Sequence, residues 1–257
     1  MDFGYTLAGF VVGTIVGLTG VGGGSLMTPL LVLAFGIHPA TAVGTDLLYA
    51  AITKAGGTVT HSLKGTVDWK ITRRLAAGSI PAAGLTLFAI SQWAPGGIGG
   101  ASKAISFALG FALLLTAMAL IFRRRLQEFA HHHATLSERQ TGVLTVLTGA
   151  VLGVLVSISS VGAGALGVTA LILLYPKLST VRIVGSDIAH AVPLTAVAGI
   201  GHWILGSVDW SLLAALLLGS LPGITLGSHL SVKVPDRVLR PILATLLVVI
   251  GGKLIAH

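Results

Sequence analysis

The amino-acid sequence predicts an all-α integral membrane protein built from two inverted-topology repeats. Each repeat is expected to hold a glycine-tipped helical hairpin, re-entrant or broken, together with three transmembrane helices. The composition indicates a membrane protein, because 54% of the 257 residues are hydrophobic and only 9% are charged, against about 25% charged residues in soluble domains. Matched glycine-rich breaks in the two halves predict the repeats. The net charge of +8 fits basic cytoplasmic loops better than a nucleic-acid partner.

The first glycine-rich break interrupts an apolar run at residues 20–26 and has four glycines in its first five positions. Glycine costs about 1 kcal/mol relative to alanine in a helix interior, so these residues are expected to end the helix. A second break of the same kind follows at residues 160–166. Paired interruptions in matching halves point to the binding site of a transporter. The tip residues expected to bind substrate are Gly20, Gly22, Gly23, Gly24 and Ser25 in the first half and Gly162, Ala163 and Gly164 in the second.

Five apolar segments follow one another in the first half. The two that flank the break, residues 7–19 and 25–35, are both shorter than the roughly 20 residues that a membrane-spanning helix needs. They are therefore expected to be the two limbs of the hairpin. The next three, residues 42–62, 75–91 and 104–122, are each expected to cross the membrane, and the last of them ends at a run of three arginines.

The second half repeats this order, with apolar segments at residues 141–158, 165–175, 183–205, 211–226 and 241–256. Equivalent residues are 140 positions apart up to the end of the hairpin and 141 apart after one inserted residue, so that Gly22 matches Gly162 and Asp46 matches Asp187. The chain is therefore divided into a first membrane repeat, a cytoplasmic linker and a second membrane repeat, at residues 1–125, 126–139 and 140–257.

Lysine and arginine collect on cytoplasmic loops, and here their distribution switches between matching loops. Residues 64–74 include four basic residues, whereas the matching loop of the second half has none. The loops at residues 176–182 and 231–240 show the opposite bias. This switch predicts inverted repeats, with both chain ends outside, the linker inside and the two hairpin tips meeting near the membrane midplane. The alternative treats each hairpin as one broken crossing and gives eight spans.

Two short helices are expected to begin directly after the breaks, near Ser25 and Ala165, with their N-termini facing each other. A helix N-terminus presents unpaired N–H groups and a partial positive charge, so two of them can hold an anion without a basic side chain. The alternative is that the glycines only permit close helix packing. Packing motifs space small residues four apart, which the contiguous glycines at residues 22–24 do not match.

The charged candidates lie on the third apolar segment of each half. Lys54 is halfway along its segment, where an ionised lysine normally faces a pathway or a partner; contact with the ligand and a structural pair with Asp46 are both open. Asp46, Asp187 and His190 are candidates for proton coupling, with structural hydrogen bonding as the alternative for the two aspartates. The remaining substrate-binding candidates are the hydroxyl residues of the matched Gly-Thr/Ser-Asp motifs, Thr45 and Ser186.

The glycine motif at residues 20–26, Pro29 and the motifs at residues 42–46 and 65–69 together resemble the TauE/SafE sulfite exporter family, also called the domain-of-unknown-function-81 or TSUP permeases. The duplication extends this resemblance over essentially the whole chain. It implies a multi-pass secondary transporter of the cell inner membrane, and not an enzyme, that exports sulfite, organosulfonates or related small anions. We expect the lipid bilayer and the anion as partners, with no cofactor, metal or nucleic acid, and a homodimer remains open.

Two other classes of function compete with anion transport. A metal or cation permease would use Asp46, Asp187 and His190, but acids are sparse in the apolar segments. An intramembrane hydrolase would need Ser186 with His190 or His202, and no Gly-x-Ser-x-Gly motif surrounds Ser186.

Overall fold

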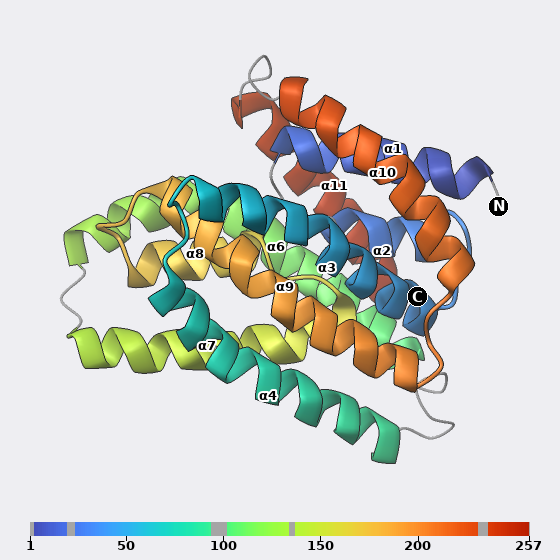
Figure 1. The fold of residues 1–257 in the computed structure, drawn as a ribbon, viewed down its shortest axis with the longest axis horizontal. Helices are drawn as coiled ribbons and strands as arrows, with labels where there is room; N and C mark the ends of the chain where they lie inside the picture. The colour runs from blue at the N-terminus through green and yellow to red at the C-terminus, as the bar shows by residue number, and fades with distance from the viewer. Residues whose placement is uncertain (1–2, 20–23, 94–101, 134–136, 231–235, 257) are drawn as a thin grey trace.

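The structure of the protein is a computed structural model that describes residues 3–19, 24–93, 102–133, 137–230 and 236–256. Within these residues the fold is entirely helical and contains no strand (Figure 1). The helices are α1 (Phe3–Thr19), α2 (Gly24–Leu33), α3 (Pro39–Leu63), α4 (Trp69–Trp93), α6 (Ser102–His133), α7 (Glu138–Ser159), α8 (Ala165–Leu174), α9 (Thr180–Ile204), α10 (Trp210–Leu230) and α11 (Asp236–Ala256).

Five of the described helices, α4, α6, α7, α9 and α10, are long and apolar enough to cross a membrane. Four details differ from the sequence prediction. The apolar part of α11, Pro241–Ala256, is expected from the sequence to cross the membrane but is too short to be among the five. Helix α3 has 25 residues but is not among the five, because its polar residues make it less apolar. Helix α7, predicted as a hairpin limb, has 22 residues and is long enough by itself. Helix α6 continues to His133, through more than half of the predicted linker.

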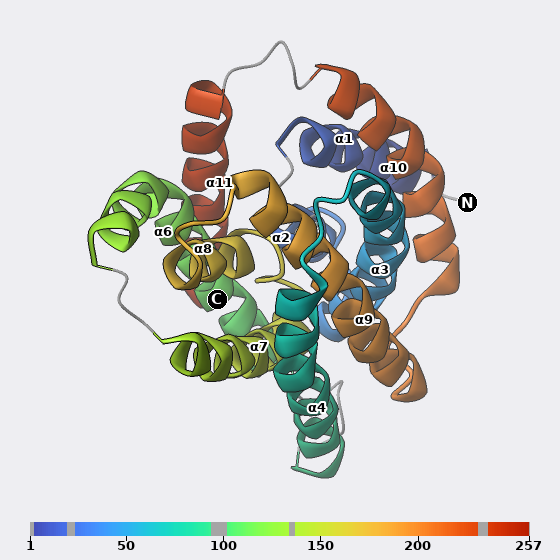
Figure 2. The same ribbon diagram turned by 60° about the vertical axis from the view of Figure 1, so that its left-hand side comes forward.

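The first helix of each half packs against the fourth helix of the other half. Helix α1 lies along α10 of the other half, and α7 lies along α4 (Figures 1 and 2). The remaining long helices pair with their own equivalents, α3 with α9 and α6 with α11. Each half therefore covers the first helix of the other.

Glycines make the exchanged contacts possible. A Cβ atom added to Gly9 of α1 would lie 2.4 Å from the carbonyl oxygen of Leu216 in α10. The equivalent Gly149 of α7 makes the equivalent contact, with 2.2 Å to the carbonyl oxygen of Leu75 in α4. Small residues let membrane helices approach to backbone contact. The contact is reciprocal, as in an interface between two copies related by a two-fold axis.

The loops before α4 and α10 are held by hydroxyl groups of the opposite half. The backbone N–H of Asp68 donates to Ser186 Oγ at 2.8 Å. In the equivalent position, the backbone N–H of Asp209 donates to Thr45 Oγ1 at 3.1 Å. These two bonds tie the third helix of each half, α9 or α3, to the loop of the other.

The carboxylates of the same loops cap the helices that follow. Asp209 Oδ1 accepts hydrogen bonds from the backbone N–H groups of Leu212 (3.0 Å) and Ser211 (2.9 Å), and also from the Ser211 hydroxyl. These donors, led by the Leu212 N–H, hold the pKa of the Asp209 carboxyl below its usual range. The resulting stabilisation is present at neutral pH and is lost as the pH falls through the lowered pKa.

Each short helix folds back on its predecessor to form a hairpin. The rings of Tyr5 in α1 and Phe35 after α2 lie 5.1 Å apart, and the equivalent residues Thr145 and Tyr175 share a hydrogen bond of 2.8 Å. The beginning of each hairpin therefore lies beside its end. The α1–α2 hairpin opens at the beginning of α3, whereas the α7–α8 hairpin opens beside Asp68, in the loop that follows α3.

Candidate functional site

The second glycine-rich break separates α7 from α8. Ser160 has a φ of 58°, Gly162 of 127° and Gly164 of 132°. The two glycine values lie in a region that residues with a Cβ rarely adopt, which explains the need for glycine at this turn. The chain leaves helical geometry here, and α8 begins at Ala165 with its N-terminal, partially positive end at the break.

The first break packs directly against the second. Gly24, the first residue of α2, is buried so closely that an added Cβ would lie 2.0 Å from the Ser160 carbonyl oxygen. Ser25 is also buried. The other predicted tip residues of this break, Gly20, Gly22 and Gly23, lie outside the described residues. The N-terminus of α2 is thus placed at the turn that precedes α8.

Asp46 of α3 joins both hairpins. Its carboxylate is fully buried, and Oδ2 accepts hydrogen bonds from Thr28 Oγ1 of α2 (2.5 Å) and Ser160 Oγ of the second break (2.9 Å). A buried carboxylate is stabilised by such donors. This arrangement corresponds to the structural hydrogen bonding that the sequence left open for Asp46.

Lys54 reaches the second break from α3. Its half-buried side chain donates from Nζ to the carbonyl oxygen of Ala163 at 2.9 Å. The ammonium group also interacts electrostatically with Asp187 and Asp46, but among the described residues neither carboxylate lies within 4.0 Å of it as an ion pair. The direct Lys54–Asp46 pair considered from the sequence is therefore absent. The lysine instead holds a backbone carbonyl of the break.

Asp187 of α9 is equivalent to Asp46 but has a different environment. It is 1% exposed, no hydroxyl group of the described chain donates to it, and its Oδ1 atom, like that of Asp46, has no hydrogen-bond partner there. The positions equivalent to Thr28 and Ser160 are Val168 and Gly20, which have no hydroxyl group. Asp187 packs instead against α8, where a Cβ added to Gly167 would lie 2.0 Å from Oδ1. The two aspartates are equivalent in the repeat but not in chemistry.

His190 lies one turn beyond Asp187 on α9. It is fully buried, and its Nε2 atom shares a hydrogen bond of 2.8 Å with Ser79 Oγ of α4. Its Nδ1 atom has no partner among the described residues. His190 also interacts electrostatically with Lys54. Lys54 therefore interacts electrostatically with all three residues proposed from the sequence for proton coupling, Asp46, Asp187 and His190.

The structure does not bring Thr45 and Ser186 to the hairpin tips. Both hydroxyls accept the loop N–H groups described above, and Ser186 Oγ also donates to the Arg182 carbonyl oxygen at 2.7 Å. Sequence reasoning missed Thr28, Ser160 and Ser79, the hydroxyl partners of Asp46 and His190. The only sequence signal that could have identified these three residues is that each is a hydroxyl residue in an otherwise apolar stretch.

No cluster of three or more His, Cys, Asp or Glu side chains that could hold a metal ion occurs in the described ranges. The polar groups that do gather are two aspartates, a lysine and a histidine around two broken helices. Buried ionisable groups beside discontinuous helices in an apolar bundle define a multi-pass membrane protein of the transporter class.

Comparison with known proteins agrees with this class. Residues 5–254 match the family described as sulfite exporter TauE/SafE. The chain is 42% identical to the probable membrane transporter protein YjnA of Bacillus subtilis (strain 168), over 99% of this chain and 100% of that protein. It is 30% identical to the probable membrane transporter protein YdhB of the same organism, over 90% of this chain and 91% of the relative.

A more distant relative, the probable membrane transporter protein MJ0441 of Methanocaldococcus jannaschii, is 24% identical over 95% of this chain and 92% of its own length. No solved structure is a significant match to the chain. The chain belongs to the TauE/SafE sulfite exporter family. It is a membrane transporter, and its relatives are named as transporters rather than as enzymes.

Proposed function

We propose that this protein is a secondary transporter of the inner membrane that exports small anions, with sulfite, organosulfonates and related sulfur-containing anions as the substrate class. The observation that carries the proposal is the Lys54 ammonium group at the Ala163 carbonyl, next to the N-terminus of α8. In other transporters the unwound carbonyls of a broken helix coordinate a coupling cation, and the helix N-terminus faces an anionic substrate. Here a built-in ammonium takes the place of the cation.

In this proposal the anion lies between the two breaks. Main-chain N–H groups of the tip residues and of the first turn of α8 hold it, and Lys54 supplies the positive charge. The family description, sulfite exporter, supports sulfite as the first substrate to test. A cation permease is disfavoured because the Lys54 ammonium already interacts electrostatically with both buried carboxylates and occupies the Ala163 carbonyl of the break.

Asp187 and His190 are proposed to couple transport to protons. Asp187 suits this role better than Asp46, because Asp46 Oδ2 already accepts two hydroxyl hydrogen bonds, whereas no hydroxyl group of the described chain donates to Asp187; the Oδ1 atoms of the two aspartates both lack a partner there. The membrane potential supplies about 2.3 kcal/mol per charge at 100 mV. With a negative interior this favours anion export, so the proton would set pH dependence rather than supply the main driving force.

Flux of radiolabelled sulfite into liposomes containing the purified protein tests this function. The wild-type protein is expected to carry sulfite and a short organosulfonate and to discriminate against sodium. Lys54→Met should lower sulfite flux by about tenfold, the loss expected for one charge-assisted hydrogen bond, while folded yield stays nearly unchanged. Lys253→Met, which removes a lysine from the last turn of α11, is the matched control.

Two results would contradict the proposal. Sodium flux without sulfite flux would replace the anion by a cation. A collapse in the yield of Lys54→Met, with normal transport by the remaining protein, would make Lys54 a purely structural partner of Ala163.

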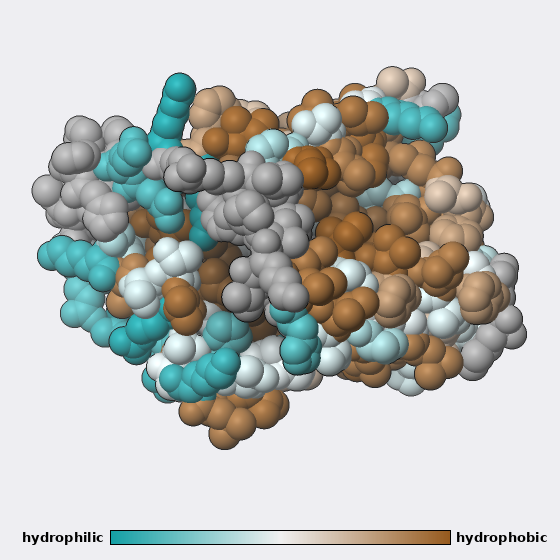
Figure 3. Space-filling model, turned by 90° about the horizontal axis from the view of Figure 1, so that it is seen from above, coloured by the Kyte–Doolittle hydropathy of each residue, from teal (hydrophilic) through white to brown (hydrophobic). Residues whose placement is uncertain are grey.

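The membrane orientation is a second proposal. We propose that the two halves have opposite topology, with the chain ends outside and the linker in the cytoplasm. The reciprocal helix contacts and the opposite openings of the hairpins support it. Figure 3 adds that hydrophilic side chains gather at one end of the visible face, the end where the α3–α4 and α8–α9 loops lie in Figure 1.

Single cysteines measure this orientation, because the chain has no cysteine of its own. Gly4→Cys and His257→Cys are both expected to react with a membrane-impermeant thiol reagent in intact cells stripped of any outer barrier. A cysteine at Glu138 should react only after the membrane is opened. Labelling of only one chain end would contradict the inverted arrangement, because it requires an odd number of crossings in each half.

A further inference from the structure

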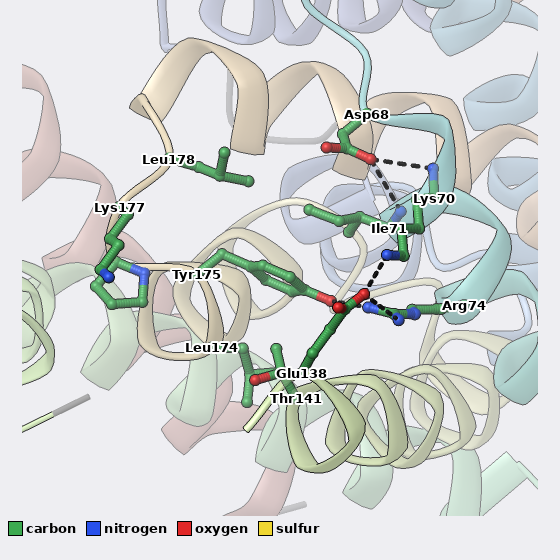
Figure 4. A pocket seen from close by; sticks show the side chains of 11 residues that line it. Asp68, Lys70, Ile71, Arg74, Glu138, Thr141, Leu174, Tyr175, Lys177 and Leu178 are labelled. Carbon is green, nitrogen blue, oxygen red and sulfur yellow. Dashed lines mark hydrogen bonds and ion pairs between the residues drawn. The ribbon is translucent and has the colours of Figure 1, made fainter. Parts of the chain in front are cut away.

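A cavity of about 420 Å³ opens at the mouth of the α7–α8 hairpin, away from the break (Figure 4). The beginning of α4, the beginning of α7 and the end of α8 line it. Its size lies within the usual range for small-molecule sites. Nothing in the proposed transport site at the hairpin tips uses these residues.

Three basic side chains and two carboxylates line this cavity. Asp68 faces Arg182, with 3.9 Å between Oδ2 and Nη2. Glu138, in contrast, lies between Lys70 and Arg74. Glu138 Oε1 pairs with Lys70 Nζ and lies 3.6 Å from Arg74 Nη2. Arg74 Nη1 also donates to the Tyr175 hydroxyl at 3.4 Å. Lys177 extends from the far wall and has no partner among the described residues (Figure 4). The lysine and the guanidinium thus already hold one carboxylate, which is the chemistry that binds an oxyanion.

The equivalent positions at the mouth of the α1–α2 hairpin are not basic. The positions equivalent to Lys70, Arg74 and Lys177 in the other half are Ser211, Ala215 and Ile37. The two hairpins differ in these side chains but not in how they close, because in each one the residue near its beginning contacts the residue at its end. The positive charge is therefore a local feature of this cavity rather than a consequence of the repeat.

Helix α8 connects the cavity to the proposed transport site. Tyr175 at its C-terminal end lines the cavity, and Ala165 at its N-terminal end follows the break that Lys54 holds. A helix of 10 residues is about 15 Å long. An anion in the cavity would be one short helix away from the transport site, on the face that the proposed orientation places in the cytoplasm.

We propose that this cavity is the cytoplasmic loading site for the transported oxyanion, and that the Glu138 carboxylate is a built-in competitor that leaves Lys70 and Arg74 when the anion binds. This inference rests on the proposed anion transport. The same basic chemistry could also hold the phosphate of a lipid headgroup, so the lipid composition is varied in the test.

Sulfite uptake into inside-out membrane vesicles, which expose the proposed cytoplasmic face, measures the effect. Glu138→Gln should lower the KM for sulfite about three- to fivefold, and Lys70→Gln should raise it by a similar factor, as expected for one unit charge at contact distance near water. Both side chains are largely exposed, so folding should not change. The shifts should shrink at high salt, because exposed charges are screened.

The matched controls remove the same charges from the exposed face of α6, at Glu128→Gln and Arg125→Gln, and should leave KM unchanged. If the wild type carries sulfite but Glu138→Gln behaves like Glu128→Gln, the loading site is wrong and the transport proposal stands. If the wild type carries no sulfite, both proposals fall. If the shifts occur in liposomes containing phosphatidylglycerol but not in pure phosphatidylcholine, the cavity is a lipid headgroup site and the inference is overturned.

Discussion

Gly24→Ala is expected to abolish sulfite transport and to lower the melting temperature of the purified protein by several degrees. The added Cβ would lie 2.0 Å from the Ser160 carbonyl oxygen. Both atoms belong to rigid parts of the chain, so the N-terminus of α2 and the second break must separate. Overpacking of this kind typically costs about 1–3 kcal/mol, and here it also displaces the two hairpin tips that the proposed site requires.

Gly84→Ala is the matched control, because the same methyl group in α4 would meet no atom within 4 Å. It should leave both transport and melting temperature unchanged. Normal transport by Gly24→Ala would show that contact between the tips is not needed for the transport cycle.

Asp46→Ala is expected to lower stability and Asp187→Ala is not, although the two residues are equivalent in the repeat. The first removes the acceptor of Thr28 and Ser160 and leaves two buried hydroxyls unpaired, each costing about 1–3 kcal/mol. The second removes a buried carboxylate whose Oδ1 atom has no partner within the described chain, so the melting temperature should stay constant or rise.

Transport separates the two variants further. Asp46→Asn, which keeps an acceptor oxygen, should recover much of the stability lost in Asp46→Ala. Asp187→Asn should fold normally but lose the pH dependence of sulfite flux, if Asp187 carries the proton. Equal destabilisation by both alanine variants would show that Asp187 has a structural partner of its own.

The helical class and the second break were predictable because each leaves a local mark on the sequence. Hydrophobic length marks helices, and the closely spaced Gly162 and Gly164 mark an interruption between two of them. The equivalence of Asp46 and Asp187 was also predictable, because equivalent residues of the two halves are 141 positions apart in this part of the chain. The all-helical fold and the membrane class are confirmed, whereas the membrane orientation and the substrate stay predictions.

The hydrogen-bond partners were not predictable. Thr45 and Ser186 stand beside the aspartates in the sequence, which suggested a shared role in binding. On a helix, consecutive residues point about 100° apart, so Thr45 faces the Asp209 loop while Asp46 faces Thr28. Which hydroxyl group bonds to which carboxylate depends on how separate helices pack. The spacing of residues within one helix does not predict it.

The exchange of α1 and α7 between the halves has a consequence for the ancestry of the chain. In the structure the first helix of each half packs on a helix of the other half, α1 on α10 and α7 on α4. An isolated half would lack that partner, so the glycine face of its first helix would meet lipid instead of a backbone. An ancestral gene encoding one half could therefore have given a stable product only as a pair of identical subunits, each completing the other. Fusion of two such genes would then have freed each copy to change separately, and the divergence of Thr28 from Val168 and of Lys54 from Thr195 is the record of that freedom.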